Sequence, residues 1–227
     1  MSYSRYAIYY MPHGAFAEFG AHLLGWDPQT GTETKGIALE GLPRPREILT
    51  KSPKKYGLHA TLKAPFRLAQ GKTEAELMSA FKAFCKTQKS ACAGQLQFSN
   101  KGGFLSLRPS SPLKQLNQLA ADCVTAFERF RRPAAPEDLK RRRKVNLTAA
   151  QDHLLLKWGY PYVMDEFRFH ITLTGRVNGS EAEQITTTLE AMIKPLLTNP
   201  FTINDLVLAA ERQDGRFCIL KRAKLLD

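Results

Sequence analysis

Residues 59–62 read His-Ala-Thr-Leu, and residues 170–173 repeat this pattern as His-Ile-Thr-Leu. Each copy lies in a segment of alternating residue types, which is typical of a β-strand. Because side chains alternate between the two faces of a strand, each histidine shares a face with the threonine two positions later. The residues between and after them face the opposite side, where they bury an apolar surface. The repeat therefore predicts two matching strands that each present an imidazole beside a hydroxyl.

The segments around these strands predict an α+β fold. Strands and helices are mixed in both halves of the chain, but few strand–helix–strand units are regular enough for a doubly wound parallel sheet. The similarity of the halves indicates an internal duplication. Residues 26–53 are rich in Gly, Pro and Thr and are expected to be a loop with a short helix after Pro45. The expected strands are Arg5–Met11, Gly57–Phe66, Gln95–Ser99, Phe104–Arg108, Phe167–Arg176 and a closing hairpin of Phe201–Ala210 with Arg216–Leu220; the expected helices are Phe16–Leu24, Lys72–Lys89, Ser111–Phe130, Thr148–Trp158 and Ser180–Ile193.

Length and composition restrict the class of protein. The 227 residues are 43% hydrophobic and 24% charged, which excludes a disordered chain and a small disulfide scaffold. No apolar run approaches the roughly 18–20 residues that span a bilayer, and the apolar segment before Pro12 is too short for the core of a signal peptide. The four cysteines are scattered and are expected to be reduced thiols. We expect a cytoplasmic protein that does not bind membranes and is a monomer.

The net charge indicates an anionic partner. The chain has 33 Lys and Arg against 21 Asp and Glu, which makes its formal charge +12. Such an excess is typical of proteins that bind nucleic acids, phosphate esters or membrane surfaces, and charge alone does not choose among them. The run Lys140–Lys144 is a candidate contact for a nucleic-acid backbone, but a charge run of this kind is more often a solvated helix end or loop.

The paired motifs suit a reaction in which one proton is taken and another is given. Imidazole acts as base or acid around neutral pH, because its unperturbed pKa is about 6.5. One neutral histidine would take a proton from an attacking water or hydroxyl, and the other, protonated, would give one to the leaving oxygen. The threonine hydroxyls can donate hydrogen bonds to the non-bridging oxygens of a phosphoryl group. This design requires no metal or other cofactor.

These motifs resemble those of the two-histidine (2H) phosphoesterase superfamily, whose signature is His, an apolar residue, Ser or Thr, and an apolar residue, occurring twice. The context looks like the bacterial branch of the superfamily that is linked to phosphonate metabolism. The similarity extends over nearly the whole chain, and both motifs are intact. The segments that carry it are Arg5–Tyr10 (RYAIYY), Leu58–Phe66 (LHATLKAPF), Trp158–Val163 (WGYPYV) and Phe169–Arg176 (FHITLTGR).

The resemblance implies a fold and an activity. The fold would be one α+β domain over residues 1–227, made of two similar lobes with a pseudo-two-fold axis. Two antiparallel sheets would flank a central cleft, with the helices on the outside. The activity would be hydrolysis or transesterification of a cyclic phosphodiester without a metal. His59 and His170 would then be the acid and base, Thr61 and Thr172 would bind the phosphate, and a sugar, alkyl or nucleotide cyclic phosphate would be the substrate.

Four further residues are candidates for substrate binding. Lys63 and Arg168 each lie two positions from a motif residue, so strand parity places them on the same face as the histidines. Tyr6 and Tyr56 can stack on a base or donate to a phosphate, although strand and loop tyrosines are more often simply buried. For Lys63 and Arg168 the alternative is a solvated strand end.

Two other functions remain open from the sequence. The chain could be a binding protein for RNA or a phosphorylated metabolite, which would use the same cleft and the basic run; its affinity would fall steeply with salt. It could also process RNA ends by the same chemistry applied to a terminal cyclic phosphate. Two intact pairs of titrating and hydroxyl groups favour an enzyme over a binder, because binding alone does not require two groups that exchange protons.

Overall fold

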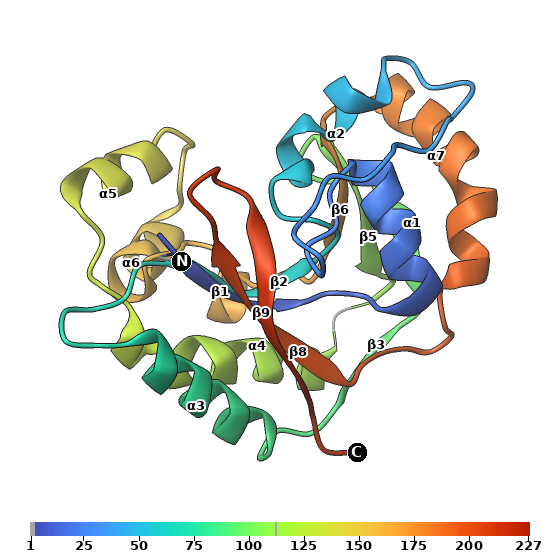
Figure 1. The fold of residues 1–227 in the computed structure, drawn as a ribbon. Helices are drawn as coiled ribbons and strands as arrows, with labels where there is room; N and C mark the ends of the chain where they lie inside the picture. Colours follow the sequence, from blue (N-terminus) through green and yellow to red (C-terminus); the bar gives the residue numbers. More distant parts are fainter. Residues whose placement is uncertain (1–2, 112) are drawn as a thin grey trace.

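The fold is built from antiparallel sheets with helices packed around them. The computed structural model describes residues 3–111 and 113–227 (Figure 1). Its largest sheet has the strand order β2-β1-β8-β9, in which every neighbouring pair is antiparallel. A second antiparallel sheet has the order β4-β5-β6, and β3 pairs with β7. The strands are β1 (Tyr6–Tyr10), β2 (Ala60–Phe66), β3 (Ala91–Gly94), β4 (Leu96–Ser99), β5 (Phe104–Pro109), β6 (Ile171–Arg176), β7 (Phe201–Ile203), β8 (Asp205–Glu211) and β9 (Phe217–Lys224).

Short-range signals in the sequence set the ends of several helices. Thr73, Thr148 and Asn178 each form a capping box at the start of a helix, which satisfies backbone N–H groups that have no partner within the helix. Gly25 ends α1 with a φ of 74°, a left-handed conformation that glycine adopts without steric cost. The helices are α1 (Gly14–Leu24), α2 (Arg46–Lys54), α3 (Glu74–Cys85), α4 (Lys114–Ala126), α5 (Pro136–Arg142), α6 (Ala149–Trp158) and α7 (Gly179–Ile193).

The helices cover the sheets unevenly. Helices α3 and α4 contact strands of the largest sheet, and α2 packs on β6 of the second sheet. Helices α5 and α6 lie together on another side of the molecule, near the start of β1 (Figure 1). The main core contains the side chains of one face of β1, which are Tyr6, Ile8 and Tyr10. The opposite face of β1 contributes to a small second cluster with Phe217, and this is the face that carries the site described below.

The α+β fold class with antiparallel sheets is confirmed, and the two repeated motifs lie in different sheets, on β2 and β6. The hairpin at Asp214–Gly215 and the helix after Pro45 are also confirmed. Strand β3 was not expected from the sequence, because its four small residues do not favour a strand. The helix expected from Ser111 begins at Lys114, and Pro112 of that prediction lies outside the described residues. The basic run at 140–144 forms the last turn of α5 and the residues after it.

Each motif histidine lies immediately before its strand rather than inside it. Strand β2 begins at Ala60 and β6 begins at Ile171, so His59 and His170 hold the same position relative to their strands.

Of the helices that the structure describes, none has the length and apolar character to cross a membrane.

Candidate active site

The two motif histidines have matching local environments. The Nδ1 of His59 donates to the carbonyl oxygen of Gly57 at 2.9 Å, and the Nδ1 of His170 donates to that of Arg168 at 2.8 Å. In both cases the carbonyl belongs to the residue two positions earlier. Because a carbonyl only accepts, Nδ1 carries the proton in each neutral ring. The nitrogen left to accept or release a proton is therefore Nε2 in both histidines.

Burial favours the neutral form of both imidazoles, because it lowers the pKa of each. It lowers the pKa of His59 to about 4, although the bond to Gly57 acts in the opposite direction. Burial also lowers the pKa of His170, against the bond to the carbonyl of Arg168. The charge of a protonated His170 lowers the pKa of His59 further, so the rings are close enough to interact electrostatically. A proton on His170 therefore disfavours a proton on His59.

Cross-strand pairing places two further residues beside the threonines. Thr61 lies opposite Tyr9 of β1, and Thr172 lies opposite Ser106 of β5. Directly opposed residues of an antiparallel pair project to the same face. Both threonines are partly buried, and they are β-branched residues with a restricted χ1 angle. Each hydroxyl is therefore held in a defined position on the face of its strand that lies beside the preceding histidine.

Arg108 belongs to the site and was not predicted. Leu107 lies opposite Ile171, so Arg108 follows the last paired residue of β5 at the end of β6 where His170 precedes the strand. The Arg108 guanidinium lies 5.6 Å from the centre of the Phe104 ring and donates to the Ser106 hydroxyl at 3.1 Å. Its charge contributes to the lowered pKa of His170. A cation at this position suits the binding of a phosphoryl oxygen. Arg108 is recognised as a site residue from the register between β5 and β6. These strands are far apart in the sequence, which does not show how they pair.

Tyr9, rather than the predicted Tyr6, lies against His59. The ring centres of Tyr9 and His59 are 4.3 Å apart. The Tyr9 hydroxyl is fully buried and has no hydrogen-bond partner among the described residues. Tyr6 is on the opposite face of β1, where its hydroxyl donates to Glu74 at 2.8 Å, and burial together with that carboxylate raises its pKa. Tyr6 therefore lies away from His59, because odd and even residues of β1 face opposite sides.

Lys63 also lies away from the histidine face. Tyr9 pairs with Thr61 and Ile8 with Lys63, so one step along β1 matches two steps along β2. This β-bulge breaks the alternation that predicted a shared face for Thr61 and Lys63. The Lys63 ammonium is buried, and it donates to Glu128 at 3.0 Å and to the carbonyl of Val124 at 2.8 Å. It connects β2 to helix α4 and has a structural role.

Replacing Lys63 by methionine is expected to affect stability and not catalysis. The Lys63→Met variant loses the two hydrogen bonds that the ammonium donates to Glu128 and to the carbonyl of Val124. Glu128 keeps its bonds to Arg131. We expect a loss of about 1–2 kcal/mol in the free energy of unfolding, measured by urea denaturation. Values of kcat and KM should change less than twofold. A tenfold rise in KM, absent from the exposed control Lys82→Met, would contradict the structural assignment of Lys63.

The remaining two predicted residues differ in their placement. Tyr56 lies beside His59, with ring centres 5.3 Å apart, and stacks on Phe217 at 5.1 Å. The Arg168 side chain is exposed and donates to the carbonyl oxygens of Asp165 and Phe167, at 2.6 Å each. Arg168 lies before β6, which begins only at Ile171, so the alternation of side chains along a strand does not fix its direction. Its guanidinium therefore contacts the backbone of the residues just before it in the chain.

No residue set is assigned to a metal ion. Within residues 3–111 and 113–227, side chains of His, Cys, Asp and Glu do not come together in groups of three or more. The four cysteines have no disulfide partner, as expected for this composition.

Comparison of the sequence with known proteins identifies relatives of greater length. A protein from Janthinobacterium sp. (strain Marseille), described as ribose 1,5-bisphosphate phosphokinase PhnN, is 35% identical over 221 residues, which are 94% of this chain and 49% of the relative. A protein of the same description from Laribacter hongkongensis (strain HLHK9) is 33% identical over 178 residues, 77% of this chain and 40% of the relative. The chain thus spans about half the length, or less, of these relatives.

Comparison of the fold finds solved structures with low sequence identity. One is described as a phosphoesterase (TM-score 0.43, 15% identity), and another is E. coli LigT complexed with NADP+ (TM-score 0.43, 14% identity); each match covers 100% of both chains. At these scores no residue role is transferred from either structure to this chain.

A family model described as "Protein of unknown function (DUF1045)" matches residues 61–218. The matched segment contains Thr61, His170 and Thr172, and it begins two residues after His59. It covers more than two thirds of the sequence, so the chain belongs to the DUF1045 family.

Proposed function

We propose that this chain is a metal-independent phosphoesterase that opens a cyclic phosphodiester by acid–base catalysis shared between His59 and His170. The observation that carries the proposal is the matching pair of Nδ1–carbonyl bonds, at 2.9 and 2.8 Å, on two strands that each present a threonine after the histidine. A matched pair of this kind leaves one proton-exchanging nitrogen on each ring. Two such nitrogens are what a hydrolysis with one general base and one general acid requires.

The proposed reaction is a displacement at phosphorus. One neutral imidazole removes a proton from water through Nε2 as the water oxygen attacks phosphorus. The bond to the leaving ester oxygen breaks, and the protonated imidazole on the other side donates its proton to that oxygen. The product is an acyclic phosphate monoester with a free hydroxyl. Thr61, Thr172 and Arg108 would donate hydrogen bonds to the non-bridging oxygens, whose charge must be stabilised in the transition state.

The relatives support a phosphorylated sugar as the kind of substrate. They carry the name of an enzyme that acts on ribose 1,5-bisphosphate, and this chain matches about half of their length or less. The sequence resemblance to a phosphonate-linked branch points in the same direction. We therefore include a role in phosphonate metabolism in the proposal, with a sugar cyclic phosphate ahead of alkyl and nucleotide cyclic phosphates.

The proposal is tested with a panel of cyclic phosphates in the presence of EDTA. Sugar, glycerol and nucleoside cyclic phosphates are incubated with the purified protein, and ³¹P NMR follows the change from a cyclic diester to a monoester. We expect turnover of at least one member, at a rate that is unchanged by the chelator. The proposal fails if no cyclic ester is opened, or if EDTA alone abolishes the activity.

The rate of hydrolysis should have an acidic optimum. Both histidine pKa values lie below 6.5, with that of His59 at about 4. Activity requires one imidazole protonated and the other neutral, a state most populated between the two pKa values, whichever ring is the acid. We expect kcat/KM to be maximal between pH 4 and 6.5 and to fall about tenfold per pH unit above that range. A profile that is flat from pH 5 to 8 would contradict the acid–base pair.

A further inference from the structure

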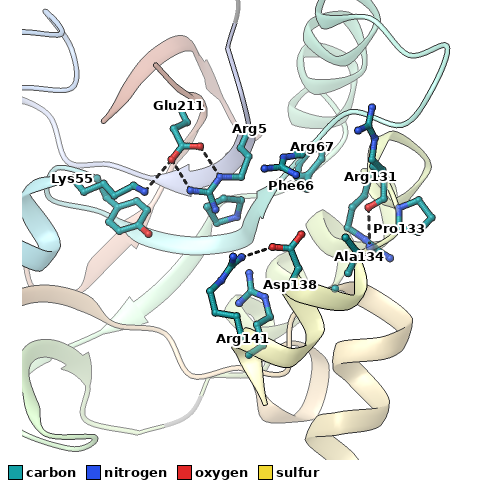
Figure 2. Close-up of a pocket in the computed structure, with 16 residues that line it drawn as sticks. Arg5, Lys55, Phe66, Arg67, Arg131, Pro133, Ala134, Asp138, Arg141 and Glu211 are labelled. Atoms are coloured by element: carbon teal, nitrogen blue, oxygen red, sulfur yellow. Dashed lines mark hydrogen bonds and ion pairs between the residues drawn. The ribbon is translucent and has the colours of Figure 1, made fainter. Parts of the chain in front are cut away.

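A basic cavity lies on the same side of the large sheet as the proposed active site. It has a volume of about 630 Å³ and is bounded by residues near the start of β1, the end of β2, helix α5 and the segment before it (Figure 2). Seven Lys and Arg side chains line it, against the two carboxylates of Asp138 and Glu211. We call it the arginine cavity. Four of these cations, Arg5, Lys55, Arg131 and Arg141, share the three carboxylates of Glu211, Glu128 and Asp138, so the lining keeps an excess of positive charge.

Two of these cations share one carboxylate. Arg5 binds Glu211 through two hydrogen bonds, at 2.6 and 2.5 Å, and Lys55 binds the same carboxylate at 2.9 Å (Figure 2). Burial alone would raise the pKa of Glu211, but the hydrogen bonds from Arg5, Ser4 and Lys55 outweigh it and lower that pKa to about 2. The carboxylate therefore stays charged and orients both cations. One negative charge is shared by two positive ones, so a net positive charge remains at this end of the cavity.

Arg142 is a cavity cation without a carboxylate partner among the described residues. It is partly buried, and its guanidinium lies 4.9 Å from the centre of the Tyr160 ring. Among the described residues, no carboxylate is within ion-pair distance of it, whereas Arg141 beside it is paired with Asp138. Burial lowers the pKa of Arg142, and the charges of Arg141 and Arg5 act in the same direction. Bringing these guanidinium groups together costs electrostatic free energy, and a bound anion would recover it.

Two tyrosines lie near both His59 and residues of the arginine cavity. Tyr56 lines the cavity, and its ring is 5.3 Å from that of His59. Tyr9 packs on His59 at 4.3 Å, and its unpartnered hydroxyl is close enough to Arg5 and Tyr56 to interact with both electrostatically. Arg5 and Tyr9 are four residues apart on one face of the chain, which corresponds to about 13 Å along the strand. A molecule that reaches from the histidines to the Arg5 end of the cavity would have to span a distance of this order.

We propose that the arginine cavity is a second anion subsite, which takes a phosphate monoester group at the far end of the same molecule whose cyclic phosphate lies between the histidines. This inference rests on the proposed function and specifies its substrate as one with two phosphate groups. The planar guanidinium groups of Arg5, Arg141 and Arg142 match the geometry of phosphate oxygens. The histidine pair would perform the reaction, and the cavity would select for length and charge.

The first test compares two substrates that differ only in the second phosphate. They are adenosine 2′,3′-cyclic phosphate and its 5′-phosphorylated form, and the quantity measured is the ratio of their kcat/KM values. We expect the wild-type protein to favour the 5′-phosphorylated compound at least tenfold, mainly through a lower KM. Equal values for the two compounds would overturn the subsite.

Variants then assign that preference to the cavity. Arg142→Met and, because Arg142 is partly buried, also the exposed Arg141→Met should each reduce the preference at least fivefold. Lys140→Met is the matched control: Lys140 belongs to the same basic run and the same helix but does not line the cavity. It should keep the wild-type ratio. A preference that survives both arginine changes, or that Lys140→Met reduces equally, would overturn the proposal.

A binding measurement separates this inference from the proposed activity. Adenosine 5′-monophosphate is titrated into the wild-type protein by calorimetry, which needs no turnover. A tenfold weaker Kd in Arg142→Met or Arg141→Met, with wild-type affinity in Lys140→Met, supports the subsite even if no cyclic ester is hydrolysed. Unchanged affinity in both arginine variants overturns it. A ten-nucleotide RNA with a 2′,3′-cyclic end that is favoured tenfold over the 5′-phosphorylated monomer would also overturn it, since the cavity would then be part of a nucleic-acid surface.

Discussion

Replacing His59 or His170 by glutamine is expected to lower kcat by about 10³-fold, while KM changes less than fivefold. Glutamine is close to histidine in size and keeps a polar side chain, but its amide does not exchange protons near neutral pH. Each variant thus loses either the base or the acid. The double variant should be little worse than either single one, because the two groups act as a unit. Initial rates on the best cyclic substrate of the panel provide the measurement.

The control for this experiment is another histidine of the same chain. His153 is exposed on helix α6, so His153→Gln should retain wild-type kcat. Thermal unfolding of all variants checks that the losses are not due to unfolding. If His59→Gln or His170→Gln kept more than a tenth of the wild-type kcat, the paired-histidine mechanism would be wrong.

The second large effect is expected from the two threonines. Thr61→Val and Thr172→Val each replace a hydroxyl by a methyl group at nearly constant volume and keep the β-branched shape that the strand favours. Each change removes one hydrogen bond to the phosphoryl group in the transition state. We expect kcat to fall about 10²-fold in each variant. The loss should appear in kcat more than in KM, because the charge on the phosphoryl oxygens grows as the reaction proceeds.

A threonine away from the site is the control for this pair. Thr202 lies in β7 and is partly buried, as Thr61 and Thr172 are. Thr202→Val should have wild-type kcat, which separates the loss of a catalytic hydroxyl from the general effect of valine in a strand. Wild-type kcat in both Thr61→Val and Thr172→Val would remove these hydroxyls from the mechanism.

Much of the fold could be predicted because its signals are local. The strand alternation around the motifs, the Asp214–Gly215 turn and the Thr148 cap each depend on residues close together in the sequence, and the structure contains the corresponding elements. The repeated motif also predicted that His59 and His170 are equivalent, and their matching carbonyl bonds agree with this.

The placements that the sequence does not show depend on a bulge, on the face of a strand and on strand pairing. The bulge opposite Ile8 places Lys63 in a buried ion pair with Glu128, and no residue type in the segment signals it. Tyr6 and Tyr9 differ only in which face of β1 they occupy, and either could have been chosen from sequence alone. Arg108 became visible as a site residue only through the pairing of β5 with β6.

The arginine cavity depends on still longer-range contacts. It joins Arg5, which precedes β1, to Arg141 and Arg142 from helix α5, more than 130 positions later in the chain (Figure 2). In the sequence, the run at 140–144 looks like one continuous basic patch. In the structure, Arg141 and Arg142 line the cavity, while Arg143 pairs with Asp152 of α6. A charge run read along the chain does not show this division.

The central claim is that His59 and His170 act on one phosphoryl group, and a crystal structure with bound orthovanadate tests it most directly. We expect Nε2 of each histidine within about 3 Å of an oxygen of the same vanadate, with the Thr61 and Thr172 hydroxyls donating to its other oxygens. Vanadate held by only one of the two imidazoles, or bound in the arginine cavity with the histidines uninvolved, would contradict it.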